Sequence, residues 1–252
     1  MRIKVCMSPD EDITLPIAYN HIIQKSIYNI LDNEYASKLH DSGYRYKNKI
    51  FKLFNFSKLT VQNKTINNGK ITIHKGKVEL IICSIDEYFI FKIISALIKH
   101  KCLKFKEGVL EIDEIYSKKQ LNRERAVVLT ISPVVVVKPT IESRTEFYNP
   151  RDKEFLISIK NNIIAKYNSF YNEEYKGILN ISILDANNIR KKIDKYKKWI
   201  YEGYLGGFII EGDTEIVELA YSCGLGSKNS QGFGCIETFK DLNGIKNYSR
   251  IV

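Results

Sequence analysis

The sequence predicts an α+β fold in which the same order of strands and helices occurs twice along the chain. Strand-like segments have apolar residues at alternate positions, and helix-like segments have them every three or four positions. Each half follows the order strand, helix, strand, strand, helix, strand, and a polar stretch at residues 117–125 separates the halves. This order is typical of the ferredoxin-like (RRM-like) βαββαβ fold, an antiparallel sheet backed by two helices. We therefore expect two tandem ferredoxin-like domains over residues 1–120 and 126–252.

The first half begins with a strand at Arg2–Met7, where basic and apolar residues alternate. Lys75 and Gly76 lie between two later strands and predict a hairpin turn. Asp86 precedes a helical pattern and is expected to cap that helix. The remaining elements of this half are helices at Pro16–Leu31, Glu34–His40 and Asp86–Lys99, and strands at Phe51–Leu59, Ile71–His74, Val78–Cys83 and Val109–Tyr116.

The second half begins with a strand at Ala126–Val137 that we expect Pro133 to bend. Its other elements are helices at Asp152–Phe170 and Thr214–Tyr221, and strands at Gly177–Leu184, Trp199–Ile210 and Phe233–Phe239. A dense basic segment of lysines and two aromatic residues comprises Lys191, Lys192, Lys195, Tyr196, Lys197, Lys198 and Trp199. Such a run is usually a solvated face. Lysines interleaved with aromatic rings also suit a single-stranded nucleic acid, so both interpretations stay open.

The net charge of +10 favours a polyanionic partner, with nucleic acid ahead of an acidic membrane surface. An A/T-rich genome would also raise the lysine content, so the charge does not decide alone. No apolar stretch has the length of a membrane span, and the N-terminus lacks an apolar signal core. The five cysteines are scattered and form no Cys-x-x-Cys pair. We expect a cytoplasmic protein with reduced, mostly buried thiols and no zinc site.

A glycine-rich loop at residues 224–234 (GLGSKNSQGFG) lies between a predicted helix and the last predicted strand. Its four glycines allow close approach of the backbone, and exposed N–H groups beside Lys228 would suit a phosphate. The loop does not match the dinucleotide-binding pattern, because Asn229 stands three residues after Gly226. It does not match the P-loop either, because Ser227 precedes Lys228 and no helical pattern follows.

The first predicted helix has two distinct faces. Its apolar residues fall within about a third of the circumference and are expected to face the core; they are Tyr19, Ile23, Ile27, Ile30 and Leu31. His21, Gln24 and Tyr28 lie on nearly the opposite side. His21 and Tyr28 are about two turns apart, so they share one stripe that points away from the core.

Tyr28, His40 and Lys52 could act together on RNA if the chain brings them into contact. Pairing of the Lys52 segment against the N-terminal strand would do so. Histidine can deprotonate the ribose 2′-OH, lysine can neutralise charge on the phosphate, and tyrosine can position an oxygen. Taken singly, each is ordinary at a surface, and Lys47 and Lys49 compete with Lys52 for the role.

The chain resembles the repeat-RNA processing endoribonucleases of CRISPR systems, members of the repeat-associated mysterious protein (RAMP) superfamily. The resemblance rests on the glycine-rich loop near the chain end and on the patches Tyr19–Tyr28, Leu39–His40, Lys52–Ser57 and Leu129–Pro133. It implies metal-independent cleavage of CRISPR repeat RNA, with no cofactor. By the same resemblance His40 is the general acid/base, Tyr28 the orienting residue and Lys52 the electrostatic stabiliser. His21 is a second candidate for the histidine.

The resemblance also implies the partners and products. Attack by the adjacent 2′-OH would leave 2′,3′-cyclic phosphate and 5′-OH ends on the cleaved precursor transcript. Other CRISPR effector subunits are further candidate partners, no membrane partner is expected, and the protein would act as a monomer or homodimer. The loop residues expected to contact RNA are Gly224, Gly226, Ser227, Lys228, Asn229, Ser230, Gln231, Gly232 and Gly234.

Two alternatives to the nuclease remain. A non-catalytic RNA-binding RAMP subunit of an effector complex would keep the loop but would lack Tyr28, His40 and Lys52 as a working group. A nucleotide-binding enzyme that used the loop is disfavoured by the two failed nucleotide motifs.

Overall fold

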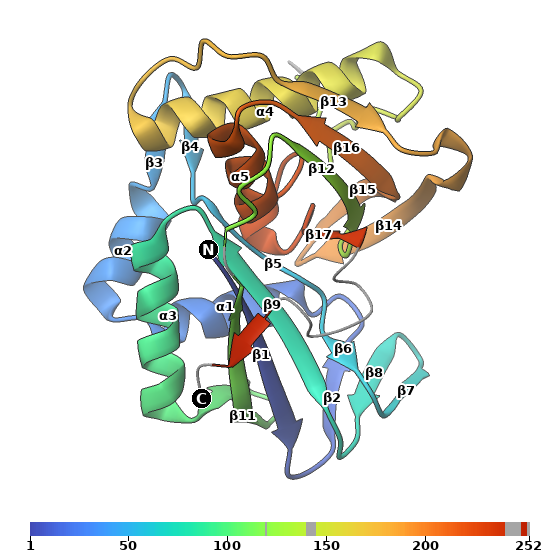
Figure 1. Ribbon diagram of the computed structural model, residues 1–252. Helices are drawn as coiled ribbons and strands as arrows, with labels where there is room; N and C mark the ends of the chain where they lie inside the picture. The colour runs from blue at the N-terminus through green and yellow to red at the C-terminus, as the bar shows by residue number, and fades with distance from the viewer. Residues whose placement is uncertain (119, 140–144, 240–247, 251–252) are drawn as a thin grey trace.

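The computed structural model describes residues 1–118, 120–139, 145–239 and 248–250. It is an α+β structure with antiparallel sheets, as the sequence predicts, and each half of the chain forms a main sheet of its own (Figure 1). No helix in the described part of the chain is long and apolar enough to cross a membrane.

The first half is built around one antiparallel sheet in the strand order β10-β11-β1-β9-β5. Its central strand β1 pairs with β9 and β11, so that Ile3 lies opposite Ile82 on one side and Ser117 on the other. Two short strands extend it: β6 pairs with β9, and β18 pairs with β11. The strands are β1 (Arg2–Pro9), β5 (Phe54–Phe56), β6 (Thr60–Val61), β9 (Val78–Ser84), β10 (Cys102–Lys104), β11 (Val109–Lys118) and β18 (Tyr248–Arg250).

Three helices accompany this sheet: α1 (Asn20–Ile30), α2 (Asn33–Asp41) and α3 (Glu87–His100). The predicted core face of α1 is confirmed, because Tyr19, Ile23, Ile27 and Leu31 are buried and Ile30 packs partly buried against the same core. Asp86 caps α3 as predicted, since its side chain accepts a hydrogen bond from the Tyr88 amide.

The second half forms a sheet in the order β13-β16-β12-β17, with helices α4 (Lys153–Tyr171) and α5 (Thr214–Cys223) packed on it. Its strands are β12 (Arg125–Thr130), β13 (Asn180–Ile183), β16 (Gly207–Glu211) and β17 (Ile236–Thr238). Val128, Phe155 and Phe208 are fully buried in the core of this half. Two short 3-10 helices, η1 (Ala186–Asn188) and η2 (Asn229–Gln231), lie in its loops.

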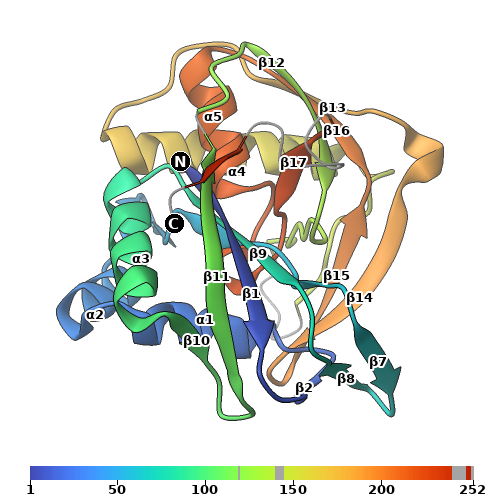
Figure 2. The same ribbon diagram turned by 60° about the horizontal axis from the view of Figure 1, so that its bottom comes forward.

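A two-stranded hairpin, β14 (Arg190–Tyr196) and β15 (Trp199–Leu205), projects from the second half toward the first. The turned view shows the hairpin extending from the second half toward the first (Figure 2). Side-chain contacts attach it to the first half; among them, Lys58 Nζ lies 2.7 Å from Asp194 Oδ2, and the Tyr196 hydroxyl donates to Gln24 Oε1. The predicted basic segment therefore lies in a hairpin that contacts the first half of the chain.

Charged side chains also link the two halves, through the Glu237 carboxylate of β17. Arg2 Nη1 lies 3.3 Å from Glu237 Oε2, and Lys118 Nζ lies 2.9 Å from Glu237 Oε1. The Tyr221 hydroxyl donates to the same carboxylate. Burial alone would raise the pKa of Glu237, but Arg2 and Lys118 lower it to about 2. Glu237 is therefore a buried carboxylate that stays ionised between the halves.

The hairpin predicted at Lys75-Gly76 is wrong. Strand β8 (Lys70–Ile73) pairs with β2 (Ile13–Pro16) and β7 (Lys64–Asn67) in a separate three-stranded sheet, while β9 joins the main sheet. The Lys75-Gly76 turn therefore connects two sheets, and Asn63 Nδ2 holds it by donating to the Lys75 carbonyl.

Other predicted elements are also divided or shortened. The strand predicted at Ala126–Val137, for example, ends at Thr130. The strand at Phe51–Leu59 breaks at Leu53, whose φ of 52° is left-handed, so that β4 (Lys49–Phe51) pairs with β3 (Tyr44–Tyr46) before β5 begins. The strand at Trp199–Ile210 divides at Gly206 into β15 and β16. The helix predicted from Pro16 starts only at Asn20, because Ile13–Pro16 forms β2.

Candidate functional site

Tyr28, His40 and Lys52 lie together, as the sequence suggests they could. Tyr28 comes from α1, His40 from the last turn of α2, and Lys52 from the residues between β4 and β5. The Tyr28 and His40 rings meet edge to face with their centroids 5.8 Å apart, and Lys52 Nζ donates a hydrogen bond to the His40 carbonyl oxygen. The route differs from the expected one, because the strand after Lys52 pairs with β9 rather than with the N-terminal strand.

The environment shifts the pKa values of Tyr28 and Lys52 in opposite directions. Burial raises the pKa of Tyr28 well above its ordinary value, and the neighbouring Tyr196 and Asp41 add to the effect. Tyr28 is therefore a neutral hydrogen-bond donor. Partial burial lowers the pKa of Lys52; Asp41 opposes this shift and Arg45 adds to it.

His40 is positioned by the residue that follows it. Its Nδ1 lies 2.8 Å from Asp41 Oδ1, and a carboxylate can only accept a hydrogen bond, so Nδ1 carries a proton. This leaves Nε2 for proton exchange with a ligand. The His40 side chain is 72% exposed, so a ligand can reach it without rearrangement of the protein.

His21 lies at the start of α1, under the hairpin. Its ring meets Tyr196 edge to face at 6.2 Å, and its Nδ1 is 3.0 Å from the Ala18 carbonyl oxygen. The structure thus places the second candidate histidine against β14, while His40 packs on Tyr28.

The glycines of the loop are explained by close packing within the protein. Gly224 ends α5, and all four glycines are buried. A Cβ on Gly226 would lie 2.5 Å from the Val135 carbonyl oxygen, and one on Gly234 would lie 1.9 Å from that of Leu225. Both residues also have a positive φ, so a larger residue would be strained there.

Three amide side chains of the first half hold the loop in place. Asn20 Nδ2 donates to the Gln231 carbonyl at 2.9 Å, and Gln24 Nε2 donates to that of Ser230 at 2.7 Å. Asn55 Nδ2 donates to the Phe233 carbonyl at 3.1 Å. The polar face of α1 is thus turned toward the loop. From the sequence, Gln24 falls on the polar face of the first helix, while Asn20 and Asn55 fall within the patches of the resemblance and receive no role of their own.

The side chains of the loop divide into buried and open groups. Asn229 is buried and donates to the carbonyls of Leu225 and Phe233. Lys228 is exposed, and Ser227, Ser230 and Gln231 are half-buried. These four are the loop side chains that a ligand could touch.

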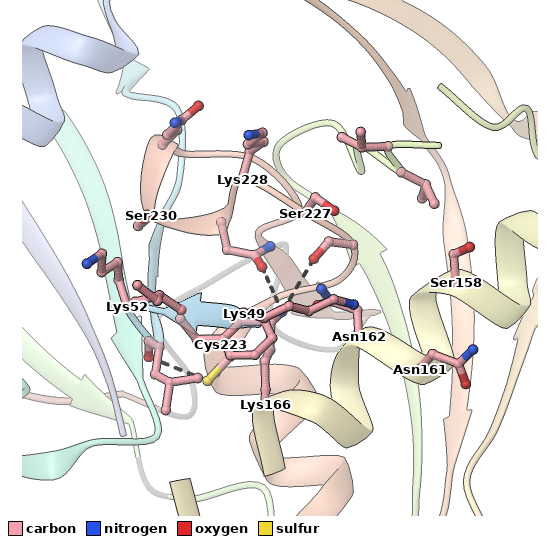
Figure 3. Close-up of a pocket in the computed structure, with 18 of the residues that line it drawn as sticks. Lys49, Lys52, Ser158, Asn161, Asn162, Lys166, Cys223, Ser227, Lys228 and Ser230 are labelled. Carbon is pink, nitrogen blue, oxygen red and sulfur yellow. Dashed lines mark hydrogen bonds between the residues drawn. The ribbon is translucent and has the colours of Figure 1, made fainter. Parts of the chain in front are cut away.

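A cleft of about 640 Å³ runs between the β4–β5 segment, α4 and the glycine-rich loop (Figure 3). Figure 3 shows Lys52 on one side of it, Ser227 and Lys228 above, and Ser158, Asn161 and Asn162 on α4 opposite. Among the described residues that line it, none is acidic. Its cationic residues are Lys49, Lys52, Lys138, Lys166 and Lys228. The cleft therefore forms a region of positive potential between Lys52 and the loop.

Lys166 of α4 supports the loop from below. Its Nζ donates to the Gly224 carbonyl at 2.8 Å, to Asn229 Oδ1 at 2.7 Å and, more weakly, to the Gly226 carbonyl at 3.4 Å. Sequence reasoning missed this residue. The sequence did carry a signal for it. Lys166 follows Ile159 and Ile163 at helical spacing, so it lies on the buried stripe of α4.

In the part of the chain that the structure describes, no three His, Cys, Asp or Glu side chains gather in a way that could hold a metal ion. The site is thus a cluster of tyrosine, histidine and lysine beside a cationic cleft.

Residues 116–238 match the family model described as "CRISPR associated protein Cas6, C-terminal". The chain is 29% identical to CRISPR-associated endoribonuclease Cas6 1 of Methanocaldococcus jannaschii, over 96% of this chain and 94% of that one. Over nearly its whole length the chain is similar to Cas6 endoribonucleases. The CRISPR-associated endoribonuclease Cas6 of Pyrococcus furiosus is 26% identical to it over 94% of this chain and 89% of that one.

Solved structures show the same similarity to Cas6. A structure titled "CRISPR associated protein Cas6" superposes with a TM-score of 0.76 at 26% identity, covering 94% of this chain and 98% of that one. A second, titled "An RAMP protein binding different RNA substrates", gives 0.78 at 26% identity, covering 95% and 99%. The resemblance to the RAMP endoribonucleases is therefore confirmed over nearly the whole chain.

Proposed function

We propose that this protein is a Cas6 endoribonuclease that cleaves the repeat RNA of a CRISPR precursor transcript to give guide RNAs. The observation that carries the proposal is the convergence of Tyr28, His40 and Lys52 beside a cationic cleft. The names of the Cas6 relatives support the same activity.

In the proposed reaction the ribose 2′-oxygen attacks the adjacent phosphorus, and the bond from phosphorus to the 5′-oxygen of the next nucleotide breaks. His40 Nε2 takes the proton of the 2′-OH or returns one to the leaving oxygen. Lys52 stabilises the negative charge that builds on the phosphate, and the neutral Tyr28 hydroxyl orients an oxygen by hydrogen bond. The products are a 2′,3′-cyclic phosphate and a 5′-hydroxyl. Every step uses these side chains, so we infer a metal-independent reaction without a cofactor.

The cleft gives the bound strand a path away from the proposed site. Lys49, Lys52 and Lys138 line it, and Lys228 with its loop neighbours closes it on the other side. We infer that repeat RNA runs through this cleft with its phosphates toward the lysines, and that the open loop side chains Ser227, Ser230 and Gln231 add hydrogen bonds.

We also infer that each half is a ferredoxin-like domain. In the first half, the four main strands in chain order are β1, β5, β9 and β11, and they lie in the spatial order β11-β1-β9-β5. In the second half, β12, β13, β16 and β17 lie in the order β13-β16-β12-β17, which is the same arrangement read from the other edge. We propose the same domain limits as the sequence does, 1–120 and 126–252, with β18 near the chain end pairing with the first sheet.

We expect the protein to act in the cytoplasm on CRISPR repeat RNA, as a monomer or homodimer, with other effector subunits as further candidate partners. The competing proposal is a non-catalytic RNA-binding subunit. It would hold the same RNA in the cleft but would not cut it.

One experiment separates the two. Radiolabelled repeat RNA is incubated with the protein in excess EDTA, beside RNA that carries a single 2′-deoxy nucleotide on the 5′ side of the cut. The proposal expects cleavage of the all-ribose RNA only, because the deoxy substrate lacks the nucleophile. Cutting of the deoxy RNA, or a strict need for magnesium, would refute the mechanism; binding without cutting would support the non-catalytic subunit.

A further inference from the structure

Lys166 is an unusual residue to find under a nucleic-acid-binding loop. Its side chain is 3% exposed, so it cannot reach a ligand in the cleft without rearrangement. Its three acceptors, the carbonyls of Gly224 and Gly226 and the Asn229 amide oxygen, are all neutral. Among its described contacts no carboxylate balances the ammonium charge.

A buried charge without a counter-charge is normally unfavourable. Burial lowers the pKa of Lys166 to about 8, and Cys223 opposes that shift. The group is thus still mostly protonated at neutral pH. The loop carbonyls that it contacts would otherwise present their negative ends to the floor of the cleft.

We propose that Lys166 is a positioning residue that turns the glycine-rich loop into an anion-binding element. Its ammonium occupies the loop acceptors and adds a fixed positive charge behind Lys228, and a phosphodiester in the cleft supplies the missing negative charge. Lys166 acts on the RNA only through the loop and through the electrostatic field, not by direct contact. This inference rests on the proposed function, because it assumes that RNA occupies the cleft.

The test compares the full-length wild-type protein with Lys166→Met and Lys166→Gln. Methionine keeps the length of the side chain without its charge, and glutamine keeps a hydrogen-bond donor for the loop. Lys153→Met is the matched control, because Lys153 is an exposed lysine at the start of the same helix. The probe is repeat RNA with a 2′-deoxy nucleotide at the cut site for binding, and all-ribose RNA for single-turnover cleavage.

Both Lys166 variants should bind about tenfold more weakly, as expected for one unit charge acting over roughly 10 Å in a medium of intermediate dielectric constant. At saturating protein, their cleavage rate should stay within about threefold of the wild type, because no reacting atom is touched. Lys153→Met should match the wild type in both measurements.

The pH dependence of RNA affinity is a further test. If Lys166 had only a structural role, removing its charge would not change that dependence. Between pH 7 and 9, wild-type affinity should fall more steeply than that of Lys166→Met, because only the wild type loses the buried charge. The other titratable groups that face this region are Cys223 on α5, Lys49 and Lys52 near β5, Lys138, and Lys228 on the loop. They are present in both proteins, so they cancel in the comparison.

Three results would overturn the proposal: unchanged affinity in folded Lys166→Met, full rescue by Lys166→Gln, or parallel pH profiles. Rescue by glutamine would mean that Lys166 holds the loop by hydrogen bonds alone and that its charge plays no part. If wild-type protein does not cleave repeat RNA at all, the proposed function fails instead, and the binding comparison still decides the role of Lys166.

Discussion

At the scale of single residues, the proposed site combines one open group with two restrained ones. The His40 ring faces solvent and takes its orientation from Asp41, whereas Tyr28 is wedged between His40 and Phe54. Lys52 is half-buried and bound to the main chain of His40. Such a site can admit RNA at the histidine while the lysine and the tyrosine keep their positions.

Replacing His40 with alanine should lower single-turnover cleavage by roughly 10²–10⁴-fold, the range for one acid/base group, and should leave RNA affinity nearly unchanged. His21→Ala is the control, since His21 packs on the hairpin. Rate measurements at saturating protein check this. If His40→Ala cuts at the wild-type rate while His21→Ala loses activity, then His21 and not His40 is the general acid/base.

Cleavage should also depend on the protonation of Lys52. Because the pKa of Lys52 is lowered, its stabilising charge is present at low pH and is lost as pH rises through a value below that of a free lysine. The wild-type rate should therefore decline within the alkaline range. Lys52→Arg should shift this decline in rate to higher pH, because arginine stays charged. Cleavage rates of both proteins are measured from pH 7 to 10. Lys47→Arg is the control, because Lys47 is an exposed lysine nearby. Identical profiles for all three proteins would argue against Lys52 as the stabiliser.

At the scale of elements, the glycine-rich loop has two faces with different tasks. Its glycines and Asn229 pack against β5, α1 and α4, while Lys228 stands in the open with its Nζ 5.8 Å from the centre of the Tyr201 ring. Substitutions on the packed face should affect folding, and substitutions on the open face should affect binding.

Lys228→Ala should weaken RNA binding modestly and should reduce the slope of log affinity against log salt by roughly 0.7, the value for one phosphate of a single strand. Gly226→Val provides the contrast, since a side chain there meets the Val135 carbonyl and should lower the melting temperature. Binding isotherms at several salt concentrations and thermal melts are measured on both variants. An unchanged slope in folded Lys228→Ala would remove the open face of the loop from the RNA surface.

At the scale of the whole molecule, the two halves are joined through polar groups as well as apolar ones. Asn20, Gln24 and Asn55 hold the loop on one side of the junction. On another side, Arg2 and Lys118 share the Glu237 carboxylate, with Arg2 and Glu237 almost fully buried. These contacts depend on a particular orientation of the halves, so the shape of the cleft is tied to them.

Glu237→Gln should lower the free energy of unfolding by about 3–5 kcal/mol, because two buried cations lose the carboxylate that faces them. Glu211→Gln is the control: its partner Arg125 is largely exposed, and such a pair contributes about 1 kcal/mol or less. Urea unfolding at pH 7 measures both. Since the folded pKa of Glu237 is lowered to about 2, the wild-type advantage should be complete above about pH 4.5 and should fade toward pH 2. Equal losses in the two variants would show that the buried cluster adds nothing to stability.

The sequence predicted the α+β class and most helices because periodicity is a local property. The apolar stripe of α1 and the cap at Asp86 could be read from a few neighbouring residues. Strand partners could not, since pairing is decided by segments far apart; β8 therefore joined β2 and β7 instead of β9. For the same reason the three site residues could be named, while Lys166 and Asn55 acquired meaning only once the loop lay against them.

The bond between Lys52 and His40 runs to the main-chain carbonyl, not to the imidazole. The lysine therefore stays anchored whichever side chain occupies position 40. One change of that side chain would remove the chemistry while the cleft, the loop and the lysine stay in place. In evolutionary terms, a nuclease and a silent RNA-holding protein are neighbours in this fold, separated by a single step that need not pass through an unfolded intermediate.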